Sequence, residues 1–253
     1  YLVGGEVPFG AGAGVDGLVV AATVKTDANY PFFDRISAFL SMGGIASSTQ
    51  FVSTTAMIDS NNISIAPSGS GTILLYDEVT AGGMPRELFV RTLDMAGVPA
   101  AGPTQITTTG GSESKASIVQ LTTGYGAIWL DSTGGATTAV LNADGTINGT
   151  AHDATSVTGA TSSIGIFGIG ASAHGVYLGS DGLLHAATIG ATGQIGAAST
   201  ISMTTANGNF AVAGGPAGAG LVYESVGFAS QITIKFRALT AGGTGAAAER
   251  DLT

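Results

Sequence analysis

The segment GAIWLD, residues Gly126–Asp131, contains the only tryptophan of the chain and decides the fold, because similar segments recur along the sequence. The clearest other copies are GTILLYDE from Gly71, GVYLG from Gly175 and GLVYES from Gly220, with GLVVAA from Gly17 as a divergent first copy. The copies repeat roughly every 50 residues, which is the period of a repeat architecture. The position of Trp129 is occupied in the five copies by Val20, Tyr76, Trp129, Tyr177 and Tyr223.

A second pair of positions recurs downstream of each copy. An apolar residue is followed four residues later by glycine, and NADG at Asn142–Gly145 has the composition of a tight hairpin. A recurrent glycine at such a turn fits a position that needs positive φ. The apolar residues are Leu40, Leu93, Leu141, Ile189 and Leu239, and the glycines are Gly44, Gly97, Gly145, Gly193 and Gly243.

Each copy therefore contains about four short strands. A strand of small residues precedes the aromatic run, and a polar β-branched stretch follows the glycine, while helical periodicity is almost absent. Four strands in a unit of about 50 residues describe the blade of a β-propeller. A β-helix and a β-sandwich are the alternatives, but the coils of the first are shorter and the second would not repeat five times.

The sequence predicts an all-β fold, a five-bladed β-propeller with four antiparallel strands per blade and no strand swapped where the ring closes. We expect residues 1–253 to form a single domain, with blades at about 1–54, 55–109, 110–156, 157–204 and 205–253. Trp129 is expected to pack between blades rather than to stack on a ligand. Asp131 is expected to be a strand-end residue that meets solvent.

The composition limits the classes of partner. Charged residues make up 10% of the chain, and the formal net charge is -9, so a phosphate backbone would be repelled and nucleic acid is not an expected partner. The absence of cysteine excludes disulfides, thiolate metal sites and a cysteine nucleophile. No apolar run approaches the roughly 20 residues that cross a bilayer, so membrane insertion is not expected.

The segment Leu88–Thr109, LFVRTLDMAGVPAAGPTQITTT, resembles the degenerate propeller repeats of secreted bacterial proteins. The neutral composition, rich in Gly, Ala, Thr and Ser, is also similar to that of bacteriophage tail and capsid decoration modules. The resemblance implies a five-bladed propeller. It does not select a function, because such repeats occur in adhesins, enzymes and virion fibres alike.

The predicted binding site lies on the long loops between the second and third strands of three copies, because binding residues collect on loops of a rigid scaffold. The first-copy loop Lys25–Arg35 concentrates aromatic and polar side chains that suit a sugar or a protein partner. Two simpler alternatives are that its phenylalanines plug the loop onto its own blade and that Arg86 and Glu87 form a solvated pair. The predicted site residues are Asp27, Asn29, Tyr30, Phe32, Phe33, Glu78, Arg86, Phe228 and Gln231.

Catalysis and metal binding have weaker support in the sequence. A glycosidase needs two or three carboxylates on neighbouring inner strands, and Asp59 with Glu113 is the best available pair. His152, His174 and His185 occupy non-equivalent positions without a nearby carboxylate cluster. We therefore predict no catalytic residues, no metal and no cofactor.

The sequence favours a non-catalytic interaction or structural module in an extracellular or virion assembly, such as a phage tail or capsid. The expected location is extracellular, on a cell surface or on a virion, and the expected partners are proteins of that assembly or a cell-surface glycan. The alternative is a lectin-like carbohydrate-binding propeller that uses the first-copy loop. A glycosidase is the third hypothesis.

Overall fold

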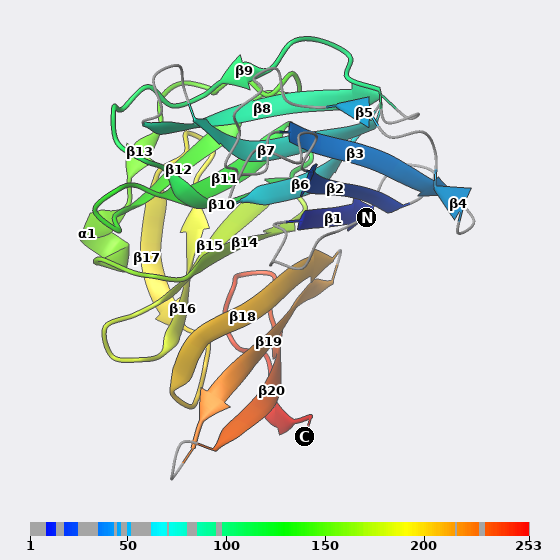
Figure 1. The fold of residues 1–253 in the computed structure, drawn as a ribbon. Helices are drawn as coiled ribbons and strands as arrows, with labels where there is room; N and C mark the ends of the chain where they lie inside the picture. The colour runs from blue at the N-terminus through cyan, green and yellow to red at the C-terminus, as the bar shows by residue number, and fades with distance from the viewer. Residues whose placement is uncertain are drawn as a thin grey trace. The chain divides into compact units, whose positions relative to one another are not determined.

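The computed structural model describes residues 9–13, 18–24, 35–42, 45–46, 50–51, 62–69, 71–79, 85–94, 98–215, 217–227 and 231–252, with side chains from residue 62 onward. Almost all regular structure in these residues is β-strand (Figure 1). One four-residue helix, α1 (Thr155–Thr158), is present among them. None of the described helical structure has the length and apolar character that a membrane crossing requires.

The strands form five antiparallel sheets, each built from consecutive strands. The first sheet has the order β1-β2-β3-β4, and β5 also pairs with β3. The other four sheets have four strands each, in the order in which the strands follow along the chain. The strands of the first sheet are β1 (Phe9–Ala13), β2 (Leu18–Val24), β3 (Arg35–Met42), β4 (Ile45–Ala46) and β5 (Gln50–Phe51).

The four remaining sheets each have three inner strands and an outer strand, which has two residues in three of the sheets and six in the other. They are β6 (Ile63–Ser68), β7 (Gly71–Val79), β8 (Arg86–Asp94) and β9 (Thr104–Gln105); β10 (Ser114–Gln120), β11 (Tyr125–Leu130), β12 (Ala136–Leu141) and β13 (His152–Asp153); β14 (Ile164–Ile169), β15 (Ser172–Leu178), β16 (Leu184–Ile189) and β17 (Ile195–Thr200); and β18 (Ala206–Gly215), β19 (Gly218–Val226), β20 (Ile232–Leu239) and β21 (Arg250–Asp251). This plan confirms the predicted all-β class with four antiparallel strands per unit.

The chain divides into two compact units. One contains residues 1–120 and 143–146, and the other contains residues 121–142 and 147–253. The prediction of one domain with five blades of about 50 residues stays a prediction.

Strand register confirms the repeat in four sheets. The shared apolar residue pairs with the residue four positions before the shared aromatic, as Thr72 with Leu93 in the second sheet and Ala173 with Ile189 in the fourth. The third and fifth sheets follow the same rule, through Tyr125 with Leu141 and Ala219 with Leu239. The sequence alignment therefore identified structurally equivalent positions in these copies.

The first copy departs from this register. Leu40 pairs with Val19. By the rule of the other four sheets, the position of the shared aromatic residue is four residues after Val19, which is Thr23. The sequence alignment placed Val20 at this position beside Leu40, so it is wrong by three residues in this copy. No aromatic residue marks the position in this strand, so the sequence offered only apolar neighbours to align.

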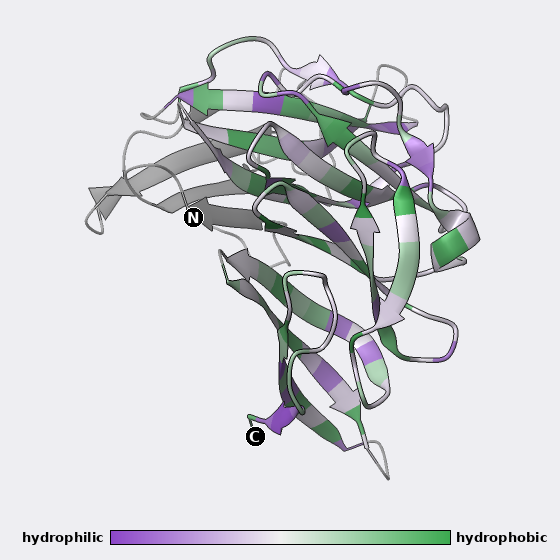
Figure 2. Cartoon of the chain, turned by 180° about the vertical axis from the view of Figure 1, so that it is seen from behind, coloured by the Kyte–Doolittle hydropathy of each residue, from purple (hydrophilic) through white to green (hydrophobic). Residues whose placement is uncertain are grey.

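The shared aromatic residues lie in the core. Tyr76, Trp129, Tyr177 and Tyr223 are between 0% and 4% exposed. The strands that carry the first two, β7 and β11, are buried along almost their whole length, which agrees with burial on both faces. Figure 2 shows mostly hydrophobic and neutral residues on the described strands, with a few hydrophilic ones among them.

Trp129 is therefore a core residue, since a ring that is 2% exposed offers no platform to a ligand in solvent. Asp131 follows its strand and closes the next turn, accepting hydrogen bonds from the Thr133 and Gly135 backbone N–H groups at 2.8 and 2.9 Å. Burial raises the pKa of the Asp131 carboxyl, but the hydrogen bonds from Thr133 and Gly135 outweigh it and hold the pKa below its ordinary value. Asp131 is thus a turn residue.

The recurrent glycine has two roles. Gly145, Gly193 and Gly243 have φ of 88°, 92° and 74°, as the hairpin interpretation predicts. Each also lies against a strand of the preceding sheet, where a Cβ on Gly145 would be 2.4 Å from Val90 Cγ1 and one on Gly193 would be 3.3 Å from Ala139 Cα. Glycine is required here both for the turn and for the close approach.

Candidate functional site

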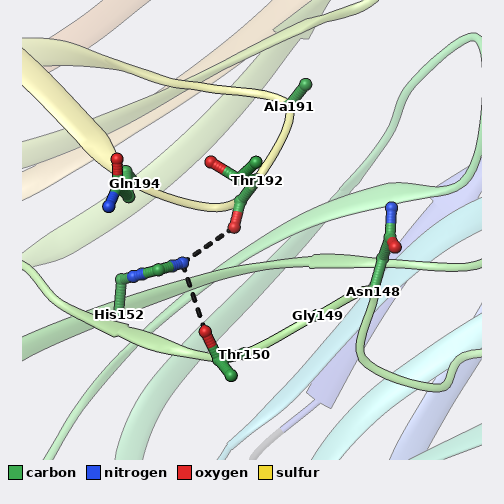
Figure 3. A pocket seen from close by; sticks show the side chains of 7 residues that line it. All are labelled: Asn148, Gly149, Thr150, His152, Ala191, Thr192 and Gln194. Carbon is green, nitrogen blue, oxygen red and sulfur yellow. Dashed lines mark hydrogen bonds between the residues drawn. The ribbon is translucent and has the colours of Figure 1, made fainter.

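A pocket of about 450 Å³ lies in the second unit (Figure 3). One wall is the segment that leads from β12 into β13, and the other is the turn between β16 and β17. The pocket is therefore built from two neighbouring repeats. The lining residues are Asn148, Gly149, Thr150 and His152 on the first wall and Ala191, Thr192 and Gln194 on the second.

Backbone hydrogen bonds hold the second wall in place. Gly193 N–H donates to the Gly190 carbonyl at 2.9 Å, and Gly190 N–H donates to the Gln194 carbonyl at 2.8 Å. The Thr138 hydroxyl of β12 donates to the Gly193 carbonyl at 2.8 Å and so ties the turn to the preceding sheet. The fold itself thus holds this wall in place, and a wall that is ordered in advance lowers the entropy cost of binding.

His152 joins the two walls. Its Nε2 lies 2.9 Å from the Thr192 carbonyl oxygen and 3.4 Å from the Thr150 hydroxyl (Figure 3). A carbonyl only accepts, so Nε2 carries the hydrogen and Nδ1 of the neutral ring is an acceptor. The histidine is specific to this repeat, because the residues at the same register in the other three sheets are Thr104, Ser199 and Arg250.

The two amide side chains stand on opposite walls. Asn148 and Gln194 are exposed, and their backbones are fixed by hydrogen bonds to Val140 and Gly190. Each amide offers two donor hydrogens and one acceptor oxygen. The lining contains no charged carboxylate, lysine or arginine. The pocket can therefore bind a neutral ligand with several hydroxyl or amide groups.

Most of the sequence-predicted site cannot be compared with this pocket. Asp27, Asn29, Tyr30, Phe32, Phe33 and Phe228 lie outside the described residues, as does Asp59. Gln231 is exposed just before β20, and it does not line the pocket. The binding role of these residues stays a prediction.

Two further residues of the predicted site, Glu78 and Arg86, lie at one end of the second sheet. Glu78 is 2% exposed and pairs across the strands with Glu87, which is 3% exposed. Arg86 forms an ion pair with Asp77 at 3.2 Å, with side chains 15% and 1% exposed. The simple alternative of a solvated Arg86–Glu87 pair is wrong, because Arg86 pairs with Asp77 while Glu87 is buried.

Glu113, the second carboxylate of the glycosidase hypothesis, is also buried at 1% exposed and accepts a hydrogen bond from the Thr109 hydroxyl at 2.5 Å. No group of three His, Asp or Glu residues suited to a metal ion occurs among the described residues. The acids of this region are held by the sheet and its turns.

Sequence reasoning missed the pocket because it followed loop length and aromatic content. The pocket uses the connections between the third and outer strands of two sheets instead, and its two walls are about 40 residues apart in the chain. A position-by-position comparison of the repeats offers one signal, because His152 stands where the other copies have no histidine.

Comparisons with known proteins support the fold. No family model matches the sequence, and no curated protein matches it. Among solved structures, a protein of unknown function from Dyadobacter fermentans is 11% identical with a TM-score of 0.63, covering 98% of this chain and 82% of that one. Aleuria aurantia lectin, solved with α-methyl-L-fucoside, is 14% identical with a TM-score of 0.52, covering 98% and 78%.

A third similar structure is the GH43_1 enzyme from Xanthomonas citri complexed with xylotriose, 13% identical with a TM-score of 0.52, covering 95% of this chain and 89% of that one. At these identities the likeness shows the fold alone, and the fold is a β-propeller. A lectin and a glycoside hydrolase both occur among these structures, so the fold does not distinguish binding from hydrolysis.

Proposed function

We propose that this β-propeller is a non-catalytic recognition module that binds a neutral carbohydrate in the pocket between Asn148 and Gln194. The observation that carries the proposal is the chemistry of the lining. Two amides, two hydroxyl side chains and an imidazole surround a space of about 450 Å³, without a charged group. Sugars present arrays of hydroxyl groups that both donate and accept, and such a set of side chains matches them.

The comparisons agree with a carbohydrate ligand. The Aleuria aurantia lectin structure contains a fucoside, and the Xanthomonas citri enzyme structure contains xylotriose. Both ligands are neutral sugars bound by proteins with the fold of this chain. The lectin-like function that the sequence raised as its alternative is thus retained, while the proposed site moves from the first-copy loop to the described pocket.

The lining favours binding over hydrolysis. Glycoside hydrolysis by the usual mechanisms uses a pair of carboxyl groups on either side of the scissile bond. None of the seven lining residues is Asp or Glu. A sugar in this pocket would be held by hydrogen bonds and released unchanged.

An extracellular or virion location and a role in an assembly stay proposals. They rest on the composition, which is similar to that of bacteriophage tail and capsid modules, and on the resemblance of Leu88–Thr109 to the propeller repeats of secreted bacterial proteins. An uncharged and exposed outer strand, β17, favours protein association as the second function.

A glycan array followed by titration calorimetry tests the carbohydrate proposal. We expect Asn148→Ala and Gln194→Ala each to weaken binding about fivefold, because a neutral hydrogen bond contributes about 1 kcal/mol. Gln120→Ala is the matched control, since it removes an exposed glutamine amide of β10 outside the pocket. Absence of any bound neutral glycan, or loss of binding in Gln120→Ala but not in Gln194→Ala, would contradict the proposal.

A further inference from the structure

The chain contains two Asn-Gly pairs, Asn148–Gly149 and Asn207–Gly208, which lie in different surroundings. Glycine has no side chain to shield its backbone nitrogen, so this nitrogen can reach the carboxamide of a preceding asparagine. An asparagine before glycine is therefore chemically labile wherever the fold does not hold its carboxamide. Both asparagines are exposed to solvent, so access of water does not distinguish them.

The fold leaves the carboxamide of the first pair unheld. Asn148 lies in the connection between β12 and β13, and its backbone N–H donates to the Val140 carbonyl at 2.8 Å. Neither the Asn148 carboxamide nor the Gly149 N–H has a hydrogen-bond partner among the described residues. In Figure 3 the Asn148 side chain stands apart from the other lining side chains. The space around Gly149 is open, because a Cβ there would meet no atom within 4 Å.

The fold holds the carboxamide of the second pair. Asn207 lies in β18, where its Nδ2 donates to the Glu224 carboxylate and its Oδ1 accepts from the Asn209 N–H at 2.9 Å. The Asn209 carboxamide donates to the same Glu224 oxygen at 2.9 Å and so helps to fix the acceptor. Gly208 is closely surrounded, since a Cβ there would be 2.8 Å from Ser163 Oγ. Attack on Asn207 therefore requires that these bonds break first.

We propose that Asn148 deamidates spontaneously in the folded protein, whereas Asn207 is protected. The Gly149 nitrogen attacks Cγ of Asn148 and forms a C–N bond, and the Cγ–Nδ2 bond breaks. Ammonia leaves with the hydrogen of the Gly149 N–H. Water then opens the resulting succinimide at either carbonyl and gives aspartate or isoaspartate. The reaction consumes water and releases ammonia, so it needs no enzyme and no cofactor.

The modification changes the chemistry of the pocket. It places a carboxylate in a lining that contains no charged group. The donor hydrogens of the amide are replaced by a group that only accepts. The altered pocket would repel an anionic sugar and would lack the amide donors that a neutral sugar meets. This consequence for binding rests on the proposed function, whereas the deamidation itself does not.

Ageing of the intact, folded chain tests the proposal without any glycan. The buffer is mildly alkaline, because the attacking nitrogen must lose its proton, and digestion with chymotrypsin and tandem mass spectrometry locate the products. We expect Asn148 to be converted at least about tenfold faster than Asn207, which must first break two hydrogen bonds, one of them to a carboxylate. Succinimide and isoaspartate at position 148 identify the mechanism. Equal rates, or faster conversion of Asn207, would overturn the proposal.

The denatured chain is the control for local sequence. In guanidinium chloride the hydrogen bonds of Asn207 are lost, so the two Asn-Gly pairs should react at similar rates. A preference for Asn148 that persists unchanged in the denatured chain would mean that the neighbouring residues select it, and not the fold.

Two variants test the cause at each pair. Glu224→Ala removes the partly exposed carboxylate that holds Asn207, and it should raise the conversion of Asn207 severalfold while leaving Asn148 unchanged. Gly149→Ala should slow the conversion of Asn148, because the added methyl group shields the attacking nitrogen. No rise at Asn207 in the first variant, or undiminished conversion of Asn148 in the second, would contradict the proposal.

Discussion

The second and fifth sheets hold a tyrosine at the same register in different polar surroundings. Tyr76 is 0% exposed and stacks on Phe89 with ring centroids 6.1 Å apart, and its buried hydroxyl has no hydrogen-bond partner among the described residues. Burial, with a further contribution from Glu78, raises the pKa of Tyr76 above its ordinary value. The core accepts the ring and leaves the hydroxyl unsatisfied.

Tyr223 is 1% exposed, but its hydroxyl donates to Glu249 Oε1 at 2.5 Å and lies 2.8 Å from the Thr204 hydroxyl. Burial and the bond to Glu249 together raise the pKa of Tyr223 to about 12. Thr204 and Glu249 lie outside the long strands of the sheet. The repeat therefore determines where the ring is buried, while irregular segments determine what the hydroxyl meets.

The largest expected effect is at the recurrent turn glycine, which the sheets share. Gly145→Ala should lower the free energy of unfolding by about 2 to 5 kcal/mol, because alanine is strained at a φ of 88° and its Cβ would collide with the buried side chain of Val90. Chemical denaturation measures the change.

Gly149→Ala is the control for that substitution. Gly149 has a φ of 90°, but a Cβ there would meet no atom within 4 Å. Its cost should be about 1 to 2 kcal/mol, which is the backbone strain alone. Equal losses for Gly145→Ala and Gly149→Ala would mean that the turn glycine does not pack against the preceding sheet.

A smaller effect separates the two tyrosines. Tyr223→Phe should lower the free energy of unfolding by about 1.5 to 3 kcal/mol, because it removes a hydrogen bond to a carboxylate. Tyr76→Phe should leave it unchanged or raise it by up to about 1 kcal/mol, because it removes a buried hydroxyl that has no partner. Similar losses in both variants, measured by urea denaturation, would show that the two sheets do not differ at this position.

The sequence predicted the features that repeat. The buried aromatic residues and the positive φ of Gly145, Gly193 and Gly243 follow from a pattern that recurs, because each copy meets the same steric demand. The first copy was aligned wrongly at Val20, since its strand has no aromatic residue to fix the register. Periodicity is thus informative only where a distinctive side chain marks the period.

The pocket and the exposure of β17 could not be predicted in the same way. His152 meets Thr192 through the packing of neighbouring sheets, and a single sequence does not state which turns come into contact. The exposure of Gly196–Thr200 is equally hidden, because IGAAST reads as any short neutral strand. The proposed binding pocket lies where one copy departs from the others, and such departures have no period.

The smallest expected effect concerns such a departure inside the fourth sheet. His174 occupies the position that Ile73 holds in the second sheet, and it is 2% exposed and stacked on Phe167 at 4.9 Å. Burial lowers the pKa of His174 below its ordinary value, and the backbone of Ala241 only partly opposes this.

The pH dependence follows from the sign of that shift. The unfolded chain takes up a proton on this histidine near pH 6.5, whereas the folded chain resists it, so the contribution to stability is complete above about pH 6.5 and declines as the pH falls. The slope from this residue is at most about 1.4 kcal/mol per pH unit. His174→Ile should remove this slope between pH 6.5 and the folded-state pKa in denaturation curves recorded at successive pH values. Persistence of the full slope in the variant would assign the pH dependence to other groups and leave His174 equivalent to the apolar residue of the second sheet.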